Sequence, residues 1–360
     1  MTGDPAGTVA AERVPERVPD TAPLPSATTA VRRLNVAFHQ YNPRIWPLVR
    51  REVTVDGYAL DWHLGHATSL HQWHLTANAC DVFEFSLSNL LIAREDPARA
   101  GLDWVGIPVF LMKMFALNQI DVHTGSGIET FADLRGKRVG IPDFHMTAGV
   151  WLRIILRQLY GIRPQDVEWY TGRTPGQRHG GAAVGDSLRP DIVVHRRGEG
   201  DPDLRTLLAS GAIDAAFGAV LPGSGDPPVP NTRRLPVELG RAAHAEFRRA
   251  TGCTPVNHTV LMQRSLAEAD PDLPLRLYHA FEESKRRAYE LEAQSIGARL
   301  VMWEEDLARN AAEFGEDPYP SGLAVNRRVV RALADELFDE GLLRSAVDVD
   351  ALFAEPTRAT

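Results

Sequence analysis

The fold is indicated first by one stretch, residues 133–156, with the sequence DLRGKRVGIPDFHMTAGVWLRIIL. Its first residues are a polar turn, and Val139-Gly-Ile-Pro142 has the apolar character of a short buried strand. Thr147 to Tyr160 then carries apolar residues at helical spacing, behind a hydroxyl residue that can cap a helix. The stretch therefore predicts a strand, a short loop and a helix, the unit from which parallel sheets are built.

The same alternation extends on both sides of this unit. Before it we expect helices at 69–77 and from 86 onward, and strands at 34–38, 58–63, 81–85 and 104–110. After it we expect strands at 167–170, 192–195 and 213–217, and helices at 204–210, 273–294 and 327–337. A chain of 360 residues is too long for one compact core in most folds, so the pattern predicts two α/β lobes. Residues 172–190, rich in Gly, Arg and Pro, are expected to be an insertion or a mobile loop.

Composition and charge limit the classes of partner. The chain has 47 acidic and 39 basic residues, a formal net charge of −8, and no basic block that could follow a phosphate backbone, so we expect no nucleic acid. No segment has the length and apolar character that would span a bilayer, so we expect no membrane partner. The two cysteines, Cys80 and Cys253, are expected to be reduced and buried, with a disulfide between them as the alternative.

The N-terminal tail bears on the compartment. Residues 1–32 are rich in Ala, Pro, Val and Thr and repeat the unit Glu-Arg-Val-Pro, so we expect a disordered tail that buries too little apolar surface to fold. The tail lacks the positive start and unbroken apolar run of a signal peptide. We therefore expect a cytoplasmic protein, which favours an enzyme over a transport receptor, because such a receptor must be exported.

Several segments occur in one characteristic order. They are DVFEFSLSNLLIA (81–93), IPVFLMKMF (107–115), the opening stretch (133–156), VEWYTG (167–172), LLASGAIDAAFGA (207–219), HTVLMQRSL (258–266) and EDPYPSGLAVNR (316–327). Together they resemble the 4,5-dihydroxyphthalate decarboxylase family over roughly residues 34–355. The run Pro142 to Trp151 and the run Glu316 to Arg327 are the most specific parts.

The resemblance implies a two-lobed, type II periplasmic-binding-protein-like (venus-flytrap) fold, with mixed sheets and a ligand cleft between the lobes. It implies that lobe 1 comprises residues 33–117 and 254–360 and that lobe 2 comprises residues 118–253. Two crossings would join the lobes, near Asn118 and near Cys253.

Candidate site residues follow from this fold. Ligands should bind at the carboxyl ends of strands and the N-termini of helices, where backbone N–H groups and the helix dipole favour an anion. The candidate catalytic residues on such turns are His39, His145 and His258. The candidate substrate-binding residues are Tyr41, Glu84, Ser86, Ser88, Asn89, Lys113, Asn118, Met146 and Thr147.

Each candidate also has a plain structural explanation. The three hydroxyl residues among them could cap helices, which is compatible with contacting an anion. His39 could be a structural histidine, and Lys113 could be a solvated charge rather than a carboxylate anchor. Glu84 is expected to be either a buried carboxylate with a raised pKa or the partner of an arginine.

Two other motifs are discounted. His63, His66, His71 and His74 resemble a metal-binding set, but the last two lie on what the pattern predicts to be a surface helix, and no acidic third ligand stands at motif spacing. Gly223 to Gly225 is not a phosphate loop, because no Lys-Ser/Thr pair follows it. We therefore expect neither a metal nor an organic cofactor.

The resemblance implies decarboxylation of a hydroxylated ring with neighbouring carboxylates. Loss of CO2 requires a proton delivered to the ring carbon that bears the carboxylate, a group that polarises the phenol, and cationic or N–H anchors for the remaining carboxylate. A histidine suits the first role, and closure of the lobes would expel water. The expected function is a cofactor-independent lyase, a decarboxylase of a small (hydroxy)aromatic or cyclic carboxylic acid.

The chain departs from the family pattern at three places. Ala116-Leu117 stand where family members tend to carry Arg-His, Lys113 stands where Arg is typical, and Pro320-Ser321-Gly322 replaces Pro-Tyr-Gly. Loss of the Arg-His pair removes an anion anchor and a proton donor, which argues against phthalate itself. We expect a less acidic or larger acid, an intermediate of a specialised biosynthetic pathway.

Other functions stay open. One alternative is a non-catalytic solute-binding protein for a small carboxylate, either cytoplasmic or exported. A second is a dehydratase or another eliminating lyase on the same scaffold, and a scaffold with a vestigial cleft is the least favoured. The expected partner is a small carboxylated ring substrate. The oligomeric state is left open, with a homodimer as one option.

Overall fold

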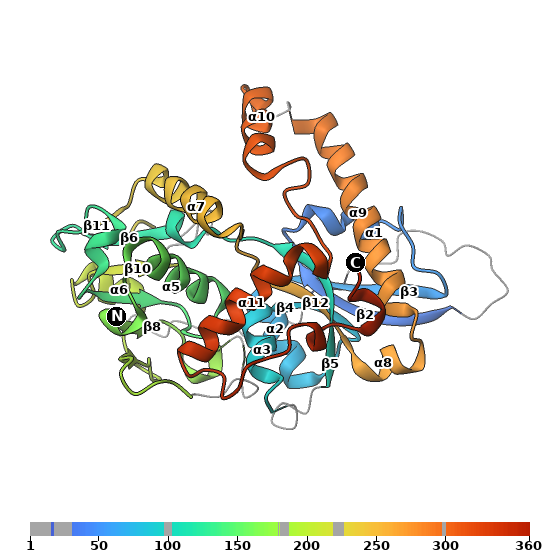
Figure 1. The fold of residues 1–360 in the computed structure, drawn as a ribbon, viewed down its shortest axis with the longest axis horizontal. Coiled ribbons are helices and arrows are strands. Elements are labelled where there is room, and N and C mark those ends of the chain that lie inside the picture. The colour runs from blue at the N-terminus through green and yellow to red at the C-terminus, as the bar shows by residue number, and fades with distance from the viewer. Residues whose placement is uncertain are drawn as a thin grey trace, which may run out of the picture.

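The computed structural model describes residues 16–17, 31–96, 103–178, 180, 187–218, 227–296 and 300–360. This part of the chain forms two lobes, each built on a six-stranded sheet with helices packed against it (Figure 1). Both sheets contain parallel and antiparallel pairs, so the predicted α/β class with two lobes and mixed sheets is confirmed. The predicted disordered tail lies outside the described residues except for Glu16–Arg17 and residues 31–32, and the Gly223 to Gly225 motif also lies outside them.

The first sheet has the strand order β1-β3-β2-β4-β12-β5. Its strands are β1 (Glu16–Arg17), β2 (Arg32–His39), β3 (Tyr58–Gly65), β4 (Val82–Ser86), β5 (Trp104–Met112) and β12 (His258–Gln263). Strands β2, β3 and β4 are parallel, whereas β12 is antiparallel to both of its neighbours. The near-continuous burial of β4 and β5 is typical of strands covered on both faces.

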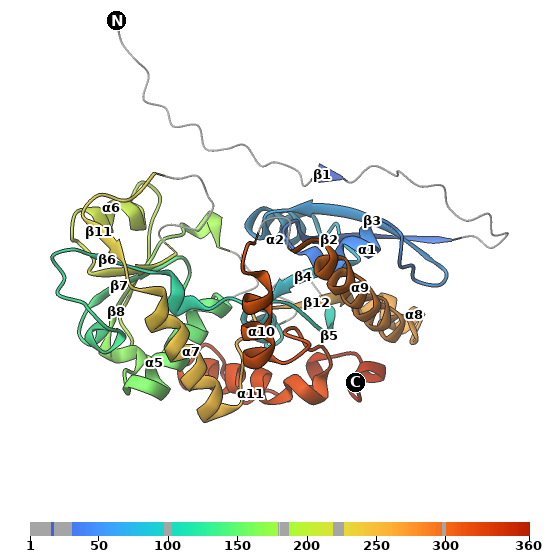
Figure 2. The same cartoon turned by 90° about the horizontal axis from the view of Figure 1, so that it is seen from above.

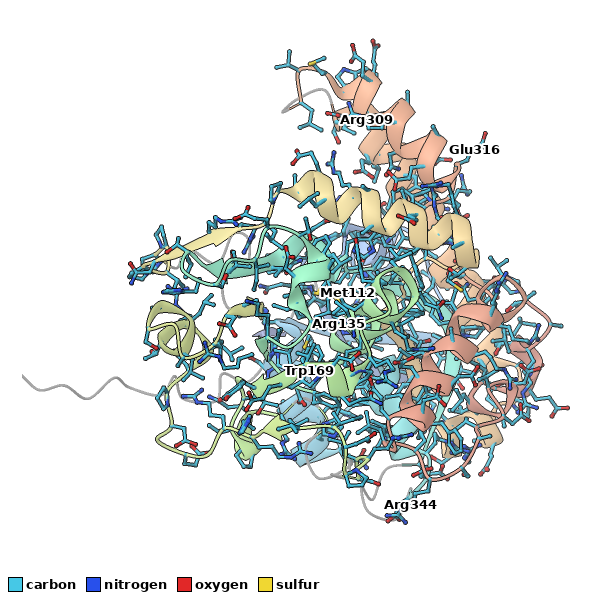
Figure 3. All side chains as sticks on the ribbon, turned by 60° about the vertical axis from the view of Figure 1, so that its left-hand side comes forward. Met112, Arg135, Trp169, Arg309, Glu316 and Arg344 are labelled. Carbon is cyan, nitrogen blue, oxygen red and sulfur yellow. The ribbon has the colours of Figure 1, made fainter. Side chains whose placement is uncertain are left out.

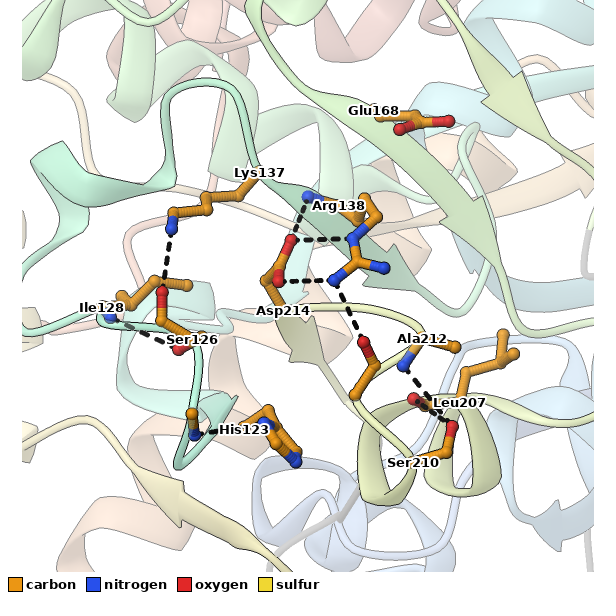
Figure 4. A network of polar contacts seen from close by, with 12 residues as sticks. His123, Ser126, Ile128, Lys137, Arg138, Glu168, Leu207, Ser210, Ala212 and Asp214 are labelled. Atoms are coloured by element: carbon orange, nitrogen blue, oxygen red, sulfur yellow. Dashed lines mark hydrogen bonds and ion pairs between the residues drawn. The ribbon is translucent and has the colours of Figure 1, made fainter.

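The second sheet has the order β11-β6-β10-β7-β8-β9. Its strands are β6 (Ile120–His123), β7 (Arg138–Ile141), β8 (Glu168–Thr171), β9 (Val194–His195), β10 (Ala215–Phe217) and β11 (Thr232–Arg234). Strands β7 to β10 are parallel, and β6 is antiparallel to β10 and β11. At the amino end of β7, Arg138 forms an ion pair with Asp214 and donates to the Gly211 carbonyl, which holds the turn before β10 (Figure 4).

The two sheets share one plan. In each, the antiparallel strand is the first one after the chain has crossed from the other lobe: β6 follows β5, and β12 follows β11 and a helix. The chain crosses between Met112 and Ile120 and returns between Thr251 and His258. The second sheet is therefore built from one contiguous segment, whereas the first sheet also needs β12, which follows the return crossing.

The helices cover both sheets and join the lobes. They are α1 (Trp46–Val49), α2 (Ala67–Ala77), α3 (Leu87–Ala93), α5 (Thr147–Tyr160), α6 (Leu204–Ala209), α7 (Val237–Thr251), α8 (Arg264–Ala269), α9 (Leu273–Ser295), α10 (Trp303–Phe314) and α11 (Leu323–Asp339). Helix α5 ends at Gly161, whose φ of 62° lies in the left-handed region that glycine adopts without strain. The sequence analysis did not predict β1, β6, β11, β12, α1, α7, α8 or α10.

Helix α11 packs against both α3 of the first lobe and α5 of the second (Figure 1). Buried side chains from both lobes, Phe85 and Trp151 among them, belong to one continuous apolar cluster. By contrast, the C-terminal part of α9 and the whole of α10 project from the body of the molecule as an arm (Figure 1). Figure 2 views this arm from above, so α10 is drawn over the body. Arg309 and Glu316 mark this arm in Figure 3.

Cys80 and Cys253 are both buried free thiols, as predicted. None of the helices in the described ranges combines the length and the apolar character needed to cross a membrane.

Ion pairs strengthen the joint between α5 and α11. Arg153 donates to both carboxylate oxygens of Glu340, at 2.5 and 2.7 Å, and both side chains are almost fully buried. Its guanidinium also lies 3.8 Å from the centre of the Phe144 ring. One helical turn away, Arg157 pairs with the buried Glu336. A bidentate pair of this kind fixes both position and orientation.

Arg153→Met tests this joint. The substitution leaves the Glu340 carboxylate buried without its cation, and breaking a buried pair in this way costs about 3–5 kcal/mol of unfolding free energy. Denaturant unfolding should show the loss, whereas Arg309→Met on the arm, where the side chain is 61% exposed, should change stability by about 0.5 kcal/mol or less. The double substitution Arg153→Met/Glu340→Leu should recover much of the loss. An unchanged midpoint for Arg153→Met would show that the pair does not hold the joint.

Candidate active site

In the first lobe, the carboxylate of Glu84 accepts hydrogen bonds from two of the predicted site residues. Glu84 lies on β4 with only 4% of its surface exposed. One oxygen accepts a hydrogen bond of 2.8 Å from His258 Nδ1, and the other accepts one of 3.2 Å from the backbone N–H of His39. The strand register explains the contact, because β12 places His258 opposite Ser86, two residues beyond Glu84.

The environment of Glu84 corrects the sequence-based expectation. Burial alone would raise the pKa of this carboxyl, but the hydrogen bond from His258 and the charges of His258 and His39 outweigh it, so the pKa lies below its usual value. Glu84 is buried as predicted, but the expectation of a raised pKa is wrong. Its side-chain partner is a histidine rather than an arginine.

Three further histidines surround this pair. Burial lowers the pKa of His39, and the Glu84 carboxylate offsets this only in part. The backbone N–H of Tyr41 donates to His39 Nδ1, so the neutral ring carries its proton on Nε2. Burial, with the nearby charge of His258, brings the pKa of His71 well below its usual value, and its Nε2 donates to the Glu84 carbonyl at 3.2 Å. The pKa of His66 is also lowered, mainly by burial and in addition by the charge of Arg173.

The prediction that His71 and His74 lie on a surface helix is wrong. Both side chains on α2 are buried, with 1% and 0% of their surface exposed. His74 packs against Phe83, with ring centres 3.9 Å apart, and its Nδ1 accepts from the Cys80 N–H. Burial lowers the pKa of His74 to about 4. Among the described residues, no group of three His, Cys, Asp or Glu side chains could hold a metal ion.

The second lobe supplies a matching pair, Asp143 and His145, in the turn between β7 and α5. Asp143 Oδ1 accepts from the ring Nδ1 of His145 at 3.2 Å and from its backbone N–H at 3.3 Å. His145 is 1% exposed, and its Nε2 has no hydrogen-bond partner within the described part of the chain. Burial would raise the pKa of Asp143, but its hydrogen bond with His145 and the charges of His145 and Arg173 lower it overall.

Arg173 is, with Asp143, a functional candidate that the sequence analysis missed. It lies two residues beyond the end of β8, in the segment predicted to be an insertion, although the carboxyl end of a strand is where this fold places ligands. Burial lowers the pKa of its guanidinium, with Asp143 offsetting this in part. Its Nη1 is buried and has no hydrogen-bond partner among the described residues. Its charge also lowers the pKa of His66 and His71, so it acts on side chains of the other lobe.

A cluster of three hydroxyl residues joins the lobes beside these pairs. Thr147 Oγ1 of α5 lies 2.9 Å from Ser86 Oγ and 3.0 Å from Ser88 Oγ, and it accepts from the Ser88 N–H at 3.1 Å. Ser88 Oγ donates to the His145 carbonyl at 2.5 Å. Ser86 stands at the N-cap of α3 without a side-chain cap bond, and the N-cap residue of α5 is Met146. The hydroxyls bridge the lobes rather than capping helices.

The other predicted site residues are distributed more widely. Asn89 is buried in the first turn of α3, and its side-chain oxygen has no hydrogen-bond partner in the described residues. Tyr41 is 72% exposed. Asn118 lies against Gly240 of α7, and Lys113 lines a different pocket at the base of the arm. The structure therefore brings together the three histidines, Glu84 and the hydroxyl residues, but neither Lys113 nor Asn118.

The chain was compared with known proteins. It is 29% identical over 331 residues to 4,5-dihydroxyphthalate decarboxylase of Comamonas testosteroni, covering 89% of this chain and 96% of that one. It is 32% identical over 194 residues to 4,5-dihydroxyphthalate decarboxylase of Pseudomonas putida, covering 52% of this chain and 71% of that one. No family model matches the chain.

Among solved structures, the periplasmic aliphatic sulphonate binding protein SsuA from Escherichia coli is similar. It is 17% identical to this chain with a TM-score of 0.49, over 91% of this chain and 99% of that one.

Arg173→Gln tests whether the charge of Arg173 acts on ionisable groups of both lobes. Removing the cation should raise the pKa of His66 towards its usual value, although burial will still hold it low, and should also raise the pKa of Asp143. Both can be followed by NMR titration of imidazole and carboxyl carbons. Arg163→Gln, which removes an arginine that is 61% exposed, should leave both pKa values unchanged. An unchanged pKa of His66 in Arg173→Gln would show that the Arg173 guanidinium does not lie near His66.

Proposed function

The chain belongs to the 4,5-dihydroxyphthalate decarboxylase family, and on that basis we propose that it is a carbon–carbon lyase that decarboxylates a small hydroxylated aromatic or cyclic acid where its two lobes meet. One observation carries the proposal. Two buried imidazoles from different lobes are each held by a carboxylate, and a buried arginine with an unpartnered N–H group acts on Asp143 of one pair and on His71, whose ring centre lies 5.5 Å from that of His258. Perturbed ionisable groups gathered in this way are typical of catalytic sites.

His258 is assigned as the acid that protonates the ring carbon. Glu84 is a fully buried carboxylate whose low pKa keeps it charged, and its hydrogen bond fixes a proton on His258 Nδ1. A buried charge needs a compensating one, and the described neighbours of Glu84 that can supply it are histidines. A protonated His258 then presents Nε2–H to the substrate.

His145 is assigned as the group that polarises the substrate hydroxyl. His145 Nδ1 lies 3.2 Å from Asp143 Oδ1, so in the neutral imidazole this nitrogen carries the proton. Arg173 adds a second positive charge that acts on Asp143, so the carboxylate does not depend on a protonated His145 alone. Nε2 is then a lone-pair acceptor. A phenol that donates to this nitrogen gains phenolate character, which stabilises the ring after the proton has added to carbon. The carbon–carbon bond then breaks and its electron pair restores the ring as CO2 leaves.

Arg173 is assigned to an anionic group that stays on the product. A cation placed on the departing carboxylate would stabilise the substrate more than the transition state, in which that charge is lost, and would slow the reaction. A spectator carboxylate or phenolate has the same charge throughout. The buried, unpartnered Nη1 of Arg173 is suited to holding it.

The substrate is proposed to differ from dihydroxyphthalate. Ala116 and Leu117 stand where the resemblance expects Arg-His, and both are buried in apolar packing. With that pair absent, Arg173 is the guanidinium that the described residues offer for spectator anions near His258 and His145, which suits an acid with fewer carboxylates. We further propose that this acid belongs to a specialised biosynthetic pathway in the cytoplasm.

Incubation of candidate acids with the purified chain, followed by mass spectrometry, tests the reaction class. Product lighter by the mass of CO2 supports a decarboxylase. Product lighter by the mass of water would replace this proposal with a dehydratase. An acid that co-purifies and stays unchanged through long incubation would replace it with a binding protein.

His258→Asn and Glu84→Gln test the acid. Each should lower kcat by about 10²–10⁴-fold, because the first removes the proton donor and the second removes the charge that holds the proton there. Arg173→Gln should mainly raise KM. The matched control is His195→Gln, which removes a histidine that is 47% exposed and paired with Glu168, and it should leave both constants unchanged. Full turnover by His258→Asn with an intact circular dichroism spectrum would exclude the assignment.

A further inference from the structure

A second pocket lies at the base of the arm, apart from the carboxylate-held histidines. Its volume is about 420 Å³, which is within the range of small-molecule sites. It is enclosed by residues of α9 and α10, by the segment 315–319 and by residues just beyond β2 and β5. None of the histidines of the candidate active site lines it.

Two cations face into this pocket without a carboxylate partner among the described residues. Arg44 lies 3.6 Å from the centre of the Tyr319 ring and donates to the Leu111 carbonyl, and its Nε is buried without a hydrogen-bond partner in the described residues. Lys113 Nζ donates to the Pro318 carbonyl and lies 5.3 Å from the same ring. The ammonium group of Lys113 and the guanidinium group of Arg44 therefore each have N–H donors that a ligand could use.

The carboxylate of Asp317 acts on Lys113 but is hydrogen-bonded to other groups. Asp317 accepts from Lys285 Nζ at 2.6 Å, from the Tyr289 hydroxyl at 3.0 Å and from the Tyr319 N–H at 2.9 Å. These three hydrogen bonds occupy it. Burial lowers the pKa of Lys113 to about 8, and although Asp317 opposes this, Arg44, Lys285 and Arg248 lower it further. The part of the pocket around Arg44 and Lys113 therefore has more positive than negative charge.

The remaining walls determine what else the ligand should have. Phe115 and Phe314 line the pocket with ring centres 5.7 Å apart, together with Tyr289 and Tyr319. These rings suit a flat apolar body. The lining also includes Glu292, Asp306 and Glu316, which disfavour a second negative charge on the ligand.

We propose that this pocket is a separate binding site for a small aromatic monoanion, with its anionic group between Arg44 and Lys113 and its ring among the aromatic side chains. The site is independent of the reaction assigned to the histidines. A chain without decarboxylase activity could still bind such a ligand here, and the two proposals fail separately.

Isothermal titration of the full chain with benzoate, benzamide and benzylamine tests this site. Benzoate should bind best of the three, and the double substitution Arg44→Gln/Lys113→Gln should weaken it by at least about tenfold, since both charge-assisted contacts are lost. Arg50→Gln, an exposed arginine on the same segment, should leave the affinity unchanged. Arg173→Gln should also leave this binding event intact, which separates it from anion binding at the histidines.

Three outcomes would overturn the site: benzoate affinity unchanged in the double variant, tighter binding of benzylamine than of benzoate, or an equal loss with Arg50→Gln. Circular dichroism of each variant distinguishes lost binding from lost folding.

The pH dependence of benzoate binding adds a readout that a structural role would not produce. A protonated Lys113 favours the anion, so affinity should fall as pH rises through about 8. The other charged or titratable groups around Lys113 are Arg44, Arg248 of α7, Lys285, Tyr289 and Glu292 of α9, Asp306 of α10, and Glu316, Asp317 and Tyr319 of the loop. Lys113→Arg keeps the charge and should abolish the fall, whereas a fall that persists in Lys113→Arg would contradict the role of Lys113.

Discussion

The buried pair between Arg153 and Glu340 is the constraint on which the arrangement of the lobes depends. Separating α5 from α11 would leave a charge in an apolar core, and that core is itself shared by both lobes. Because α5 is held in this way, its first residue Thr147 stays within hydrogen-bond distance of Ser86 and Ser88. The two halves of the site are thus fixed relative to each other by packing that lies outside it.

Charge balance then determines the chemistry that the site can support. Glu84 and Asp143 are both buried and both have a lowered pKa, so each must be matched by a positive charge or by several donors. The pKa of Asp143 is lowered by His145 and also by the charge of Arg173, whereas the groups that lower the pKa of Glu84 are histidines. This difference in neighbouring cations supports the roles proposed for the two imidazoles, His258 as the acid and His145 as the acceptor.

The sequence could predict the sheets and the strand ends because apolar runs and helix starts are local signals. Glu84, His145 and Thr147 lie together since their turns meet at one edge of the fold. The sequence could not place Arg173 or Lys113, because the direction of a long side chain depends on packing far away in the chain. His71 on α2 was mistaken for a surface residue because burial of a polar helix face has no local signature.

The late return of β12 to the first sheet has a consequence for synthesis of the chain. Strand β12 lies in the interior of the first sheet but is translated after the whole second sheet, so β4 and β5 have no partner between them until residue 263 has emerged. The second sheet needs only a contiguous segment from β6 to β11. The paired strands of the second sheet are closer together in the sequence, which favours folding of the second lobe during translation. The first lobe is then completed late, next to a second lobe that has already formed.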